Sequence, residues 1–167
     1  MRRPTDKYEI EPIGFQYKDF VQEIVYQAIF VAKDEMAPTR EILNKPELEK
    51  YYKQWGRKGD VGYVVIHTAS EQPIGGAFVR YYHTKEAGYG FVAESYPELN
   101  IALLPDHRSK GLGTRLLNQL LQSLKNQGCA GVSLSVDRRN PAFALYQRLG
   151  FKTVRAEENP TMLLLFS

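Results

Sequence analysis

Two basic side chains and two glycines follow an apolar stretch of the chain. Residues 99–113 read LNIALLPDHRSKGLG, which places Arg108 and Lys110 just before Gly111 and Gly113. Arginine and lysine attract phosphate, and glycine lets an anion approach main-chain N–H groups because it has no side chain. If a helix begins at the glycines, its first N–H groups and its positive end point to the same place. The spacing therefore predicts an anion site for a phosphorylated ligand.

Other phosphate-binding loops fit this segment less well. In a Walker A loop the lysine follows the last glycine, whereas Lys110 precedes both glycines here. A dinucleotide-binding fingerprint needs a third glycine, and Gly113 is followed by the residues TRL. Gly111 and Gly113 can also simply shape a tight turn. Neither of these two motifs fits, so the loop is expected to bind a phosphorylated ligand of another kind.

Two motifs resemble the hallmarks of the GNAT superfamily of acyl-CoA-dependent N-acetyltransferases. RSKGLG at 108–113 matches its Arg/Gln-x-x-Gly-x-Gly/Ala signature, and NPAFALY at 140–146 with LGF at 149–151 resembles its second hallmark. The resemblance covers roughly residues 60–167, is strongest over 99–151, and finds no family motif before Val61. It implies an α/β GNAT fold in a single domain over 1–167: a mixed, mostly antiparallel sheet of about seven strands, flanked by about four helices.

The resemblance also implies how acetyl-CoA is held. In the family the strand at 99–104 splays from its neighbour at a bulge, which opens a cleft where acyl donor and amine meet. The main chain after this strand would pair with the amide-bearing pantetheine arm like an added strand, and the following loop would cradle the pyrophosphate. Asn140 is also expected to cap a helix, whatever it contacts. The expected cofactor-binding residues are Leu103, Leu104, Pro105, Arg108, Ser109, Lys110, Gly111, Leu112, Gly113, Thr114, Asn140 and Tyr146.

The implied reaction is direct attack of a primary amine on the acetyl thioester. An alkylamine with a pKa near 10.4 is less than about 0.1% neutral at pH 7, so a base must take its proton. Glu98 is the first candidate for this base and Glu94 the second, although either can be a solvated acid in a turn. Tyr146 is the candidate acid for the departing thiolate, and its alternative role is a core aromatic with a satisfied hydroxyl group.

Other reactive residues have simpler explanations. Cys129 would carry the acetyl group in a ping-pong reaction, but no base neighbours it in the sequence, which favours a small buried hydrophobe. His83 is a remote candidate for the base. Several aromatic side chains can either wall the acceptor site or cover the sheet: Tyr51, Tyr52, Trp55, Tyr81 and Tyr82.

Composition excludes several classes of protein. Lysine and arginine outnumber aspartate and glutamate by 22 to 19, too small and dispersed an excess to indicate nucleic-acid binding. The single cysteine excludes an internal disulfide and favours a reducing, cytoplasmic compartment, and the histidines lack metal-ligand spacing. Residues 1–6 are polar and no apolar run of signal-peptide type follows them. No segment approaches the ~18 apolar residues of a membrane span.

The helices and strands expected around these residues follow the order β-α-α-β-β-β-α-β-α-β-β. Apolar residues at helical spacing, proline and capping signals predict helices over 17–32, 46–55, 112–127 and 141–149. Alternation and β-branched runs predict strands at 8–13, 61–67, 74–82, 91–104, 130–136, 151–154 and 162–166, the fourth interrupted near Pro97. Gly75 and Gly76 lie inside a strand, which indicates a bulge or the close approach of another main chain.

The sequence is therefore interpreted as an N-acetyltransferase, a monomer or homodimer that uses acetyl-CoA and no metal in a ternary complex with an amine. A small-molecule primary amine is the favoured acceptor, and protein N-termini or lysines are the alternative. A non-catalytic acyl-CoA-binding sensor is the alternative from another class. Acceptor contacts are expected from residues 14–60 and 83–97, where the sequence matches no family motif.

Overall fold

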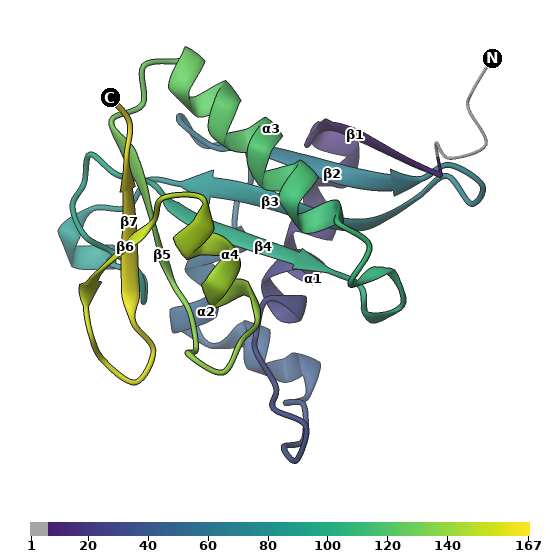
Figure 1. Ribbon diagram of the computed structural model, residues 1–167. Coiled ribbons are helices and arrows are strands. Elements are labelled where there is room, and N and C mark those ends of the chain that lie inside the picture. Colours follow the sequence, from purple (N-terminus) through teal and green to yellow (C-terminus); the bar gives the residue numbers. More distant parts are fainter. Residues whose placement is uncertain (1–6) are drawn as a thin grey trace.

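A single seven-stranded sheet organises the chain (Figure 1). The structure is a computed structural model that describes residues 7–167, so the polar segment at residues 1–6 lies outside the described part. The strand order is β1-β2-β3-β4-β5-β7-β6, and every neighbouring pair is antiparallel except β4 and β5. The predicted mixed, mostly antiparallel sheet is confirmed.

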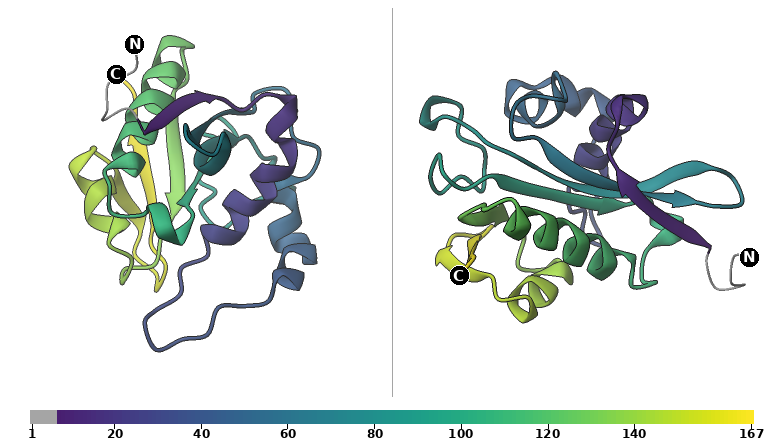
Figure 2. Two further views of the ribbon diagram at one scale, coloured as in Figure 1. Left: turned by 90° about the vertical axis from the view of Figure 1, so that its right-hand side faces the viewer. Right: turned by 90° about the horizontal axis from the view of Figure 1, so that it is seen from above.

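Four helices flank the sheet in two layers. Helices α1 and α2 cover one face, and α3 and α4 cover the other (Figure 2). The helices are α1 (Lys18–Gln27), α2 (Pro46–Tyr52), α3 (Leu112–Asn126) and α4 (Ala142–Arg148). The strands are β1 (Tyr8–Pro12), β2 (Val61–His67), β3 (Gln72–Arg80), β4 (Glu98–Leu103), β5 (Gly131–Ser135), β6 (Lys152–Arg155) and β7 (Thr161–Leu165). Short 3₁₀ turns lie at Phe15–Tyr17, Arg40–Asn44, Thr84–Glu86 and Pro105–His107.

Several elements are shorter than the sequence predicted. Helix α1 ends at Gln27, and the apolar residues at 28–30 that follow it line a cavity. Helix α2 ends at Tyr52, and the strand predicted from residue 91 begins only at Glu98, just after Pro97. Strand β3 begins at Gln72, two residues before the predicted start, so Pro73 lies inside the strand and pairs with Ile66 beside a register shift.

The glycine pair in β3 lets neighbouring groups come close. A Cβ atom on Gly75 would lie 2.8 Å from the carbonyl oxygen of Ala102, and one on Gly76 would lie 2.9 Å from that of Tyr63. The β2–β3 register also shifts between Val65 and Ile66. Both parts of the expectation for this pair, a bulge and a close main-chain approach, are therefore confirmed.

Strands β4 and β5 separate almost as soon as they meet. Their register contains the single pair Glu98 and Ser133 among the described residues, and β5 pairs along its other edge with β7. The predicted splay is thus present. The bulge implied for β4 is not, since its register with β3 runs unbroken from Arg80 opposite Glu98 to Gly75 opposite Leu103.

Alternation along β4 gives its two faces different chemistry. Leu99, Ile101 and Leu103 belong to the core under α3, which buries a leucine stripe at helical spacing. Glu98 and Asn100 therefore point to the opposite face, toward α1 and α2. The buried leucines of α3 are Leu112, Leu116, Leu117, Leu120, Leu121 and Leu124.

A buried ion pair fixes α2 on its face of the sheet. The Arg80 guanidinium donates to both carboxylate oxygens of Asp60, at 3.0 and 2.8 Å, and both side chains are almost fully buried. The same guanidinium donates to the carbonyl oxygens of Lys50 and Lys53 at the end of α2. Because Arg80 lies opposite Glu98 in the sheet, this clamp also holds α2 beside Glu98.

Candidate active site

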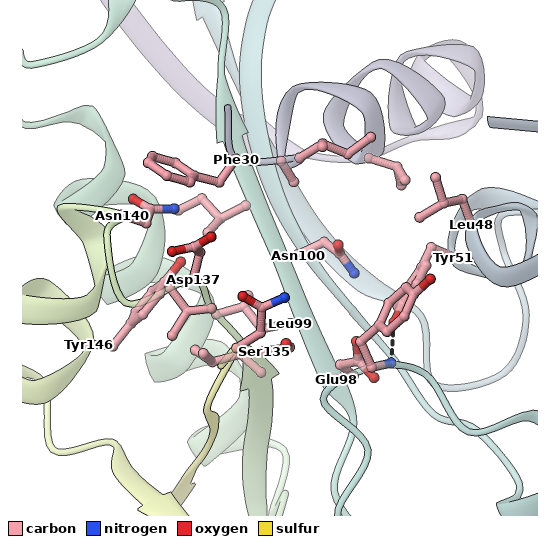
Figure 3. A pocket seen from close by; sticks show the side chains of 18 of the residues that line it. Phe30, Leu48, Tyr51, Glu98, Leu99, Asn100, Ser135, Asp137, Asn140 and Tyr146 are labelled. Carbon is pink, nitrogen blue, oxygen red and sulfur yellow. Dashed lines mark hydrogen bonds between the residues drawn. The ribbon is translucent and has the colours of Figure 1, made fainter. Parts of the chain in front are cut away.

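A cavity opens where β4 and β5 separate. Its volume is about 350 Å³, and Figure 3 shows Glu98, Tyr51 and Leu48 on one side of it, with Asn140, Asp137 and Tyr146 on the other. The splay therefore creates the cavity and places a carboxylate and a phenol around it. The lining residues are Val25, Ala28, Ile29, Phe30, Ile42, Leu48, Tyr51, Tyr89, Glu98, Leu99, Asn100, Ile101, Leu134, Ser135, Val136, Asp137, Asn140, Tyr146 and Asn159.

Glu98 is a buried carboxyl group whose ionised form is only weakly stabilised by its surroundings. The residue is 4% exposed, and its Oε1 has no hydrogen-bond partner among the described residues. Burial raises the pKa of Glu98 from 4.5 to about 7, against smaller opposing effects of the Tyr51 hydroxyl, the Gly90 main chain and the Lys50 and Arg155 charges. A carboxyl group with a pKa near neutrality is suited to accept a proton at physiological pH.

Other unpaired polar atoms surround Glu98. Ser133 is its register partner on β5, Asn100 lies two residues further along β4, and burial and then the Glu98 charge raise the pKa of Tyr82. The Ser133 Oγ, Asn100 Nδ2 and Tyr82 hydroxyl are all buried without a hydrogen-bond partner in the described chain. Such unsatisfied groups are rare in protein cores, so their gathering around one carboxyl group indicates a functional site.

The raised pKa makes a testable statement about stability. Below about pH 4.5 both folded and unfolded Glu98 are protonated, and between pH 4.5 and 7 only the unfolded form ionises. Ionisation thus costs the native state up to about 3.5 kcal/mol above pH 7, at 1.4 kcal/mol per pKa unit. Glu98→Gln should therefore raise the urea midpoint at pH 8 much more than at pH 4.5. An equal change at both pH values would contradict the raised pKa.

Tyr146 reaches the cavity from α4. The residue is 7% exposed, its ring packs against Phe151 with 5.7 Å between centroids, and its hydroxyl has no hydrogen-bond partner within residues 7–167. Burial raises the pKa of Tyr146 above its ordinary value of 10, so the phenol stays protonated at any working pH. The side chain can donate a hydrogen bond to a group that enters the cavity.

The segment between β5 and α4 forms the rim of the cavity. The Asn140 Oδ1 accepts a hydrogen bond of 2.9 Å from the N–H of Ala142, so the predicted capping role is confirmed. Arg139 donates to Asp137 Oδ2 at 2.9 Å, pairs with Glu35 Oε1 at 3.0 Å and lies over the ring of Phe30. Arg139 thereby joins this segment to the one after α1.

The loop before α3 offers free main-chain donors. Gly111 has φ = 79°, a left-handed conformation that suits glycine, and it immediately precedes the first residue of α3. None of the N–H groups of residues 109–114 has a hydrogen-bond partner among the described residues, and a Cβ on Gly111 or Gly113 would meet only open space. Exposed Lys110 lies in the same loop. The loop therefore fits a pyrophosphate, which takes several N–H donors and a positive charge.

The Arg108 side chain is already hydrogen-bonded to other parts of the chain, unlike the N–H groups of residues 109–114. Its Nε donates to the carbonyl oxygen of Leu103 at 2.9 Å, and its guanidinium also donates to Gln27 on α1 at 3.2 Å. The Leu104 N–H donates a hydrogen bond to the carbonyl oxygen of Ile74 in β3. Pairing of a pantetheine arm with the Leu103 carbonyl would therefore require Arg108 to turn toward the loop.

The weaker candidates lie outside the cavity. Glu94 accepts hydrogen bonds from the N–H and hydroxyl of Thr84, and exposed His83 lies 3.7 Å from its carboxylate. The Cys129 Sγ donates to the Gly131 carbonyl at 3.2 Å and lies 3.5 Å from the Tyr81 hydroxyl. Within residues 7–167 no three acidic, histidine or cysteine side chains group as a metal site, and no helix is long and apolar enough to cross a bilayer.

Sequence reasoning missed part of the site. Asn100, Ser135, Asp137 and Phe30 line the cavity but belong to no motif. Alternation along β4 was the available signal for Asn100, because a residue two positions from Glu98 must share its face. Of the aromatic residues considered for the acceptor wall in the sequence, Tyr51 lines the cavity, and its hydroxyl accepts a hydrogen bond of 2.7 Å from the N–H of Tyr89 (Figure 3).

Comparison with known proteins agrees with this geometry. The model of the acetyltransferase (GNAT) family matches residues 28–151, so the chain belongs to this family, as its two motifs predicted. The structure is also similar to PaiA N-acetyltransferase from Thermoplasma acidophilum in complex with coenzyme A, with a TM-score of 0.65, 16% identity and coverage of 95% of this chain and 99% of that one. The fold is therefore that of GNAT acetyltransferases.

Two curated relatives match shorter parts of the chain. The [ribosomal protein bS18]-alanine N-acetyltransferase of Escherichia coli K12 is 43% identical over 65 residues, which span 37% of this chain and 44% of the relative. An N-alpha-acetyltransferase of Saccharolobus solfataricus is 41% identical over 59 residues, 34% of this chain and 35% of the relative. The chain thus matches less than half the length of either curated relative. Family and relatives support an acyl-CoA-dependent acetyltransferase.

Proposed function

We propose that this protein is an N-acetyltransferase that moves the acetyl group of acetyl-CoA directly to a primary amine, with both substrates bound together. The observation that carries the proposal is the buried carboxyl group of Glu98, which faces one cavity with the phenol of Tyr146. The free N–H groups of residues 109–114 support the use of a CoA thioester. No covalent acetyl-enzyme is needed, since Cys129 does not line the cavity.

In this proposal Glu98 removes the amine's proton during attack. Full transfer from an ammonium of pKa about 10.4 to a carboxylate of pKa about 7 is uphill by roughly 4.6 kcal/mol. Two effects reduce this cost. The apolar wall lowers the pKa of a buried ammonium, and bond formation to the thioester carbon makes the nitrogen more acidic. The carboxylate therefore acts best during bond formation.

Tyr146 serves the other end of the reaction. The departing thiolate has a pKa of about 8.5 if it behaves like an ordinary thiol, well below the raised pKa of the buried phenol. Complete proton transfer from Tyr146 is then unfavourable. A hydrogen bond from its hydroxyl to the developing negative charge on sulfur is the contribution that this pKa allows, and such a bond strengthens as the charge grows.

Tyr146→Phe should lower kcat by about 10- to 100-fold with little change in the Kd of coenzyme A, because only the hydroxyl is lost. Steady-state kinetics and calorimetric titration measure the two quantities separately. Phe143→Leu is a control on the same helix, at a position that does not line the cavity. If Tyr146→Phe weakened coenzyme A binding as much as turnover, the hydroxyl would act in ground-state cofactor binding and not on the developing thiolate, and its proposed role would be wrong.

The acceptor we favour is a small molecule. The cavity of about 350 Å³ has the size of a small-ligand site, and the Arg139–Glu35 pair joins two segments whose neighbouring residues line it. A polypeptide N-terminus is the second candidate, and one specific finding favours it. One curated relative is named as an alanine N-acetyltransferase that acts on a ribosomal protein, and the other as an N-alpha-acetyltransferase.

The proposed activity is tested by thiol release. Free coenzyme A is measured from acetyl-CoA, with and without a panel of primary amines that includes peptides. Acceptor-dependent release with the matching N-acetyl product is the expected result. Tight binding of acetyl-CoA without release for any amine would instead identify an acyl-CoA-binding sensor.

A further inference from the structure

The cavity has one uncommitted negative charge. Glu98 and Asp137 are the acidic side chains among its described lining residues. Asp137 is bound by Arg139 through hydrogen bonds of 3.1 and 2.9 Å, and those bonds hold the pKa of its carboxyl group below the ordinary value. Only Glu98 is left to meet an ammonium group. A second ammonium on the same acceptor would lie against a neutral wall and lose its hydration without a partner.

The cavity also lacks an available positive charge. Its described lining contains no lysine, arginine or histidine. Lys50 and Arg155 influence the Glu98 pKa, but the Lys50 Nζ donates to the Ala87 carbonyl at 2.9 Å and the Arg155 guanidinium donates to that of Phe91. A free carboxylate beside the reacting amine would have no counter-charge and would be repelled by Glu98.

The wall formed by the segments around α1 and α2 is largely apolar, and a buried amide donor lies on the same strand face as Glu98. Ile29, Ile42 and Leu48 line it from the segments around α1 and α2, and Leu48 points into the cavity (Figure 3). The Asn100 Nδ2 is buried without a partner on the same strand face as Glu98. An unsatisfied buried N–H is costly, so a ligand oxygen that accepts from it is favoured there.

We propose that the acceptor carries its primary amine on a neutral, largely apolar body, with a carbonyl or similar oxygen near the amine. It has neither a free carboxylate nor a second ammonium group. This inference rests on the proposed function and specifies the acceptor of the same site. Amino-acid amides and the first residue of a polypeptide share this chemistry. Free amino acids and polyamines do not.

Matched acceptors test the charge selection. Leucine is compared with leucinamide, and 1,6-diaminohexane with 1-aminohexane, by kcat/KM for thiol release at pH 8. The neutral-bodied member of each pair should be preferred by at least about tenfold, the factor for 1.4 kcal/mol. The tripeptide Leu-Ala-Ala-amide is added to distinguish a small amino-acid amide from a polypeptide N-terminus as the acceptor. A higher kcat/KM than leucinamide assigns the site to polypeptide ends, and a lower one assigns it to small molecules; either supports the shared chemistry.

The paired acceptors differ in the pKa of the reacting amine as well as in charge. Variants of Leu48 separate these two effects. Leu48→Glu supplies the missing second carboxylate, Leu48→Lys supplies the missing cation, and Leu48→Gln is the neutral control of similar size. Relative to Leu48→Gln, Leu48→Glu should raise the ratio of kcat/KM for the diamine to that for the monoamine by about tenfold. Leu48→Lys should raise the ratio of kcat/KM for leucine to that for leucinamide by a similar factor. Each ratio compares the same two acceptors on two proteins, so their own pKa values cancel.

The outcomes separate this inference from the proposed function. Release with leucine or the diamine at least as fast as with its partner on the unaltered protein overturns the acceptor chemistry and leaves acetyl transfer intact. Ratios that do not move in folded Leu48 variants overturn it as well. No release with any acceptor overturns the proposed function, and the acceptor inference with it.

Discussion

Glu98→Gln is expected to lower kcat by about 10²- to 10⁴-fold, the range for loss of a general acid or base. The amide has nearly the same shape as the carboxyl group but cannot take a proton. In the unaltered protein kcat should fall as the pH drops through about 7, where Glu98 becomes protonated. That acidic limb should be missing from the residual activity of the variant.

Glu94→Gln is the matched control for this result. Glu94 was the second candidate for the base, but it is exposed and caps a turn at Thr84 outside the cavity. Its variant should keep kcat within about twofold. A Glu98→Gln protein that retains most of its activity, or the same acidic limb, would show that another group accepts the proton.

Gly111→Val is expected to weaken coenzyme A binding at least about 100-fold. The valine side chain would project into the open space beside the free N–H groups of residues 109–114 and block the approach of phosphate oxygens. The φ of 79° is also strained for a β-branched residue, which costs about 1 to 2 kcal/mol of stability. Calorimetric titration with coenzyme A gives the Kd, and urea unfolding gives the stability.

The other end of the same helix provides the control. Gly128 has φ = 81°, and a Cβ there would likewise meet nothing within 4 Å. Gly128→Val therefore introduces comparable strain away from the loop, so it should lose similar stability while keeping the Kd of coenzyme A. If both variants bound coenzyme A equally well, the loop at 109–114 would not be the cradle. If both lost binding equally, strain alone would explain the loss.

The cofactor side of the fold could be predicted because its signals are local. The glycine loop, the leucine stripe of α3 and the Asn140 cap each follow from residues within a few positions of one another. The ends of elements were less predictable. Helix α1 stops at Gln27 although apolar residues continue, and those residues line a cavity that distant strands complete.

The chemistry of the site depended on contacts that the sequence does not display. Glu98 could be picked as a base from its place at the end of the splayed strand, but its raised pKa arises from burial in the folded chain. That burial depends on the clamp between Arg80 and Asp60, two residues that no motif contains. The free Asn100 donor and the absence of lining cations, within the described cavity, likewise appear only once distant segments are assembled.

The claim on which the account depends is that free main-chain donors before α3 hold the diphosphate of coenzyme A. The most direct measurement is an amide NMR titration of the isotope-labelled protein with coenzyme A. The account predicts that, at saturation, the largest shifts fall on the amides of residues 109–114, with smaller ones along β4. Saturated binding that leaves those loop amides unmoved would contradict it.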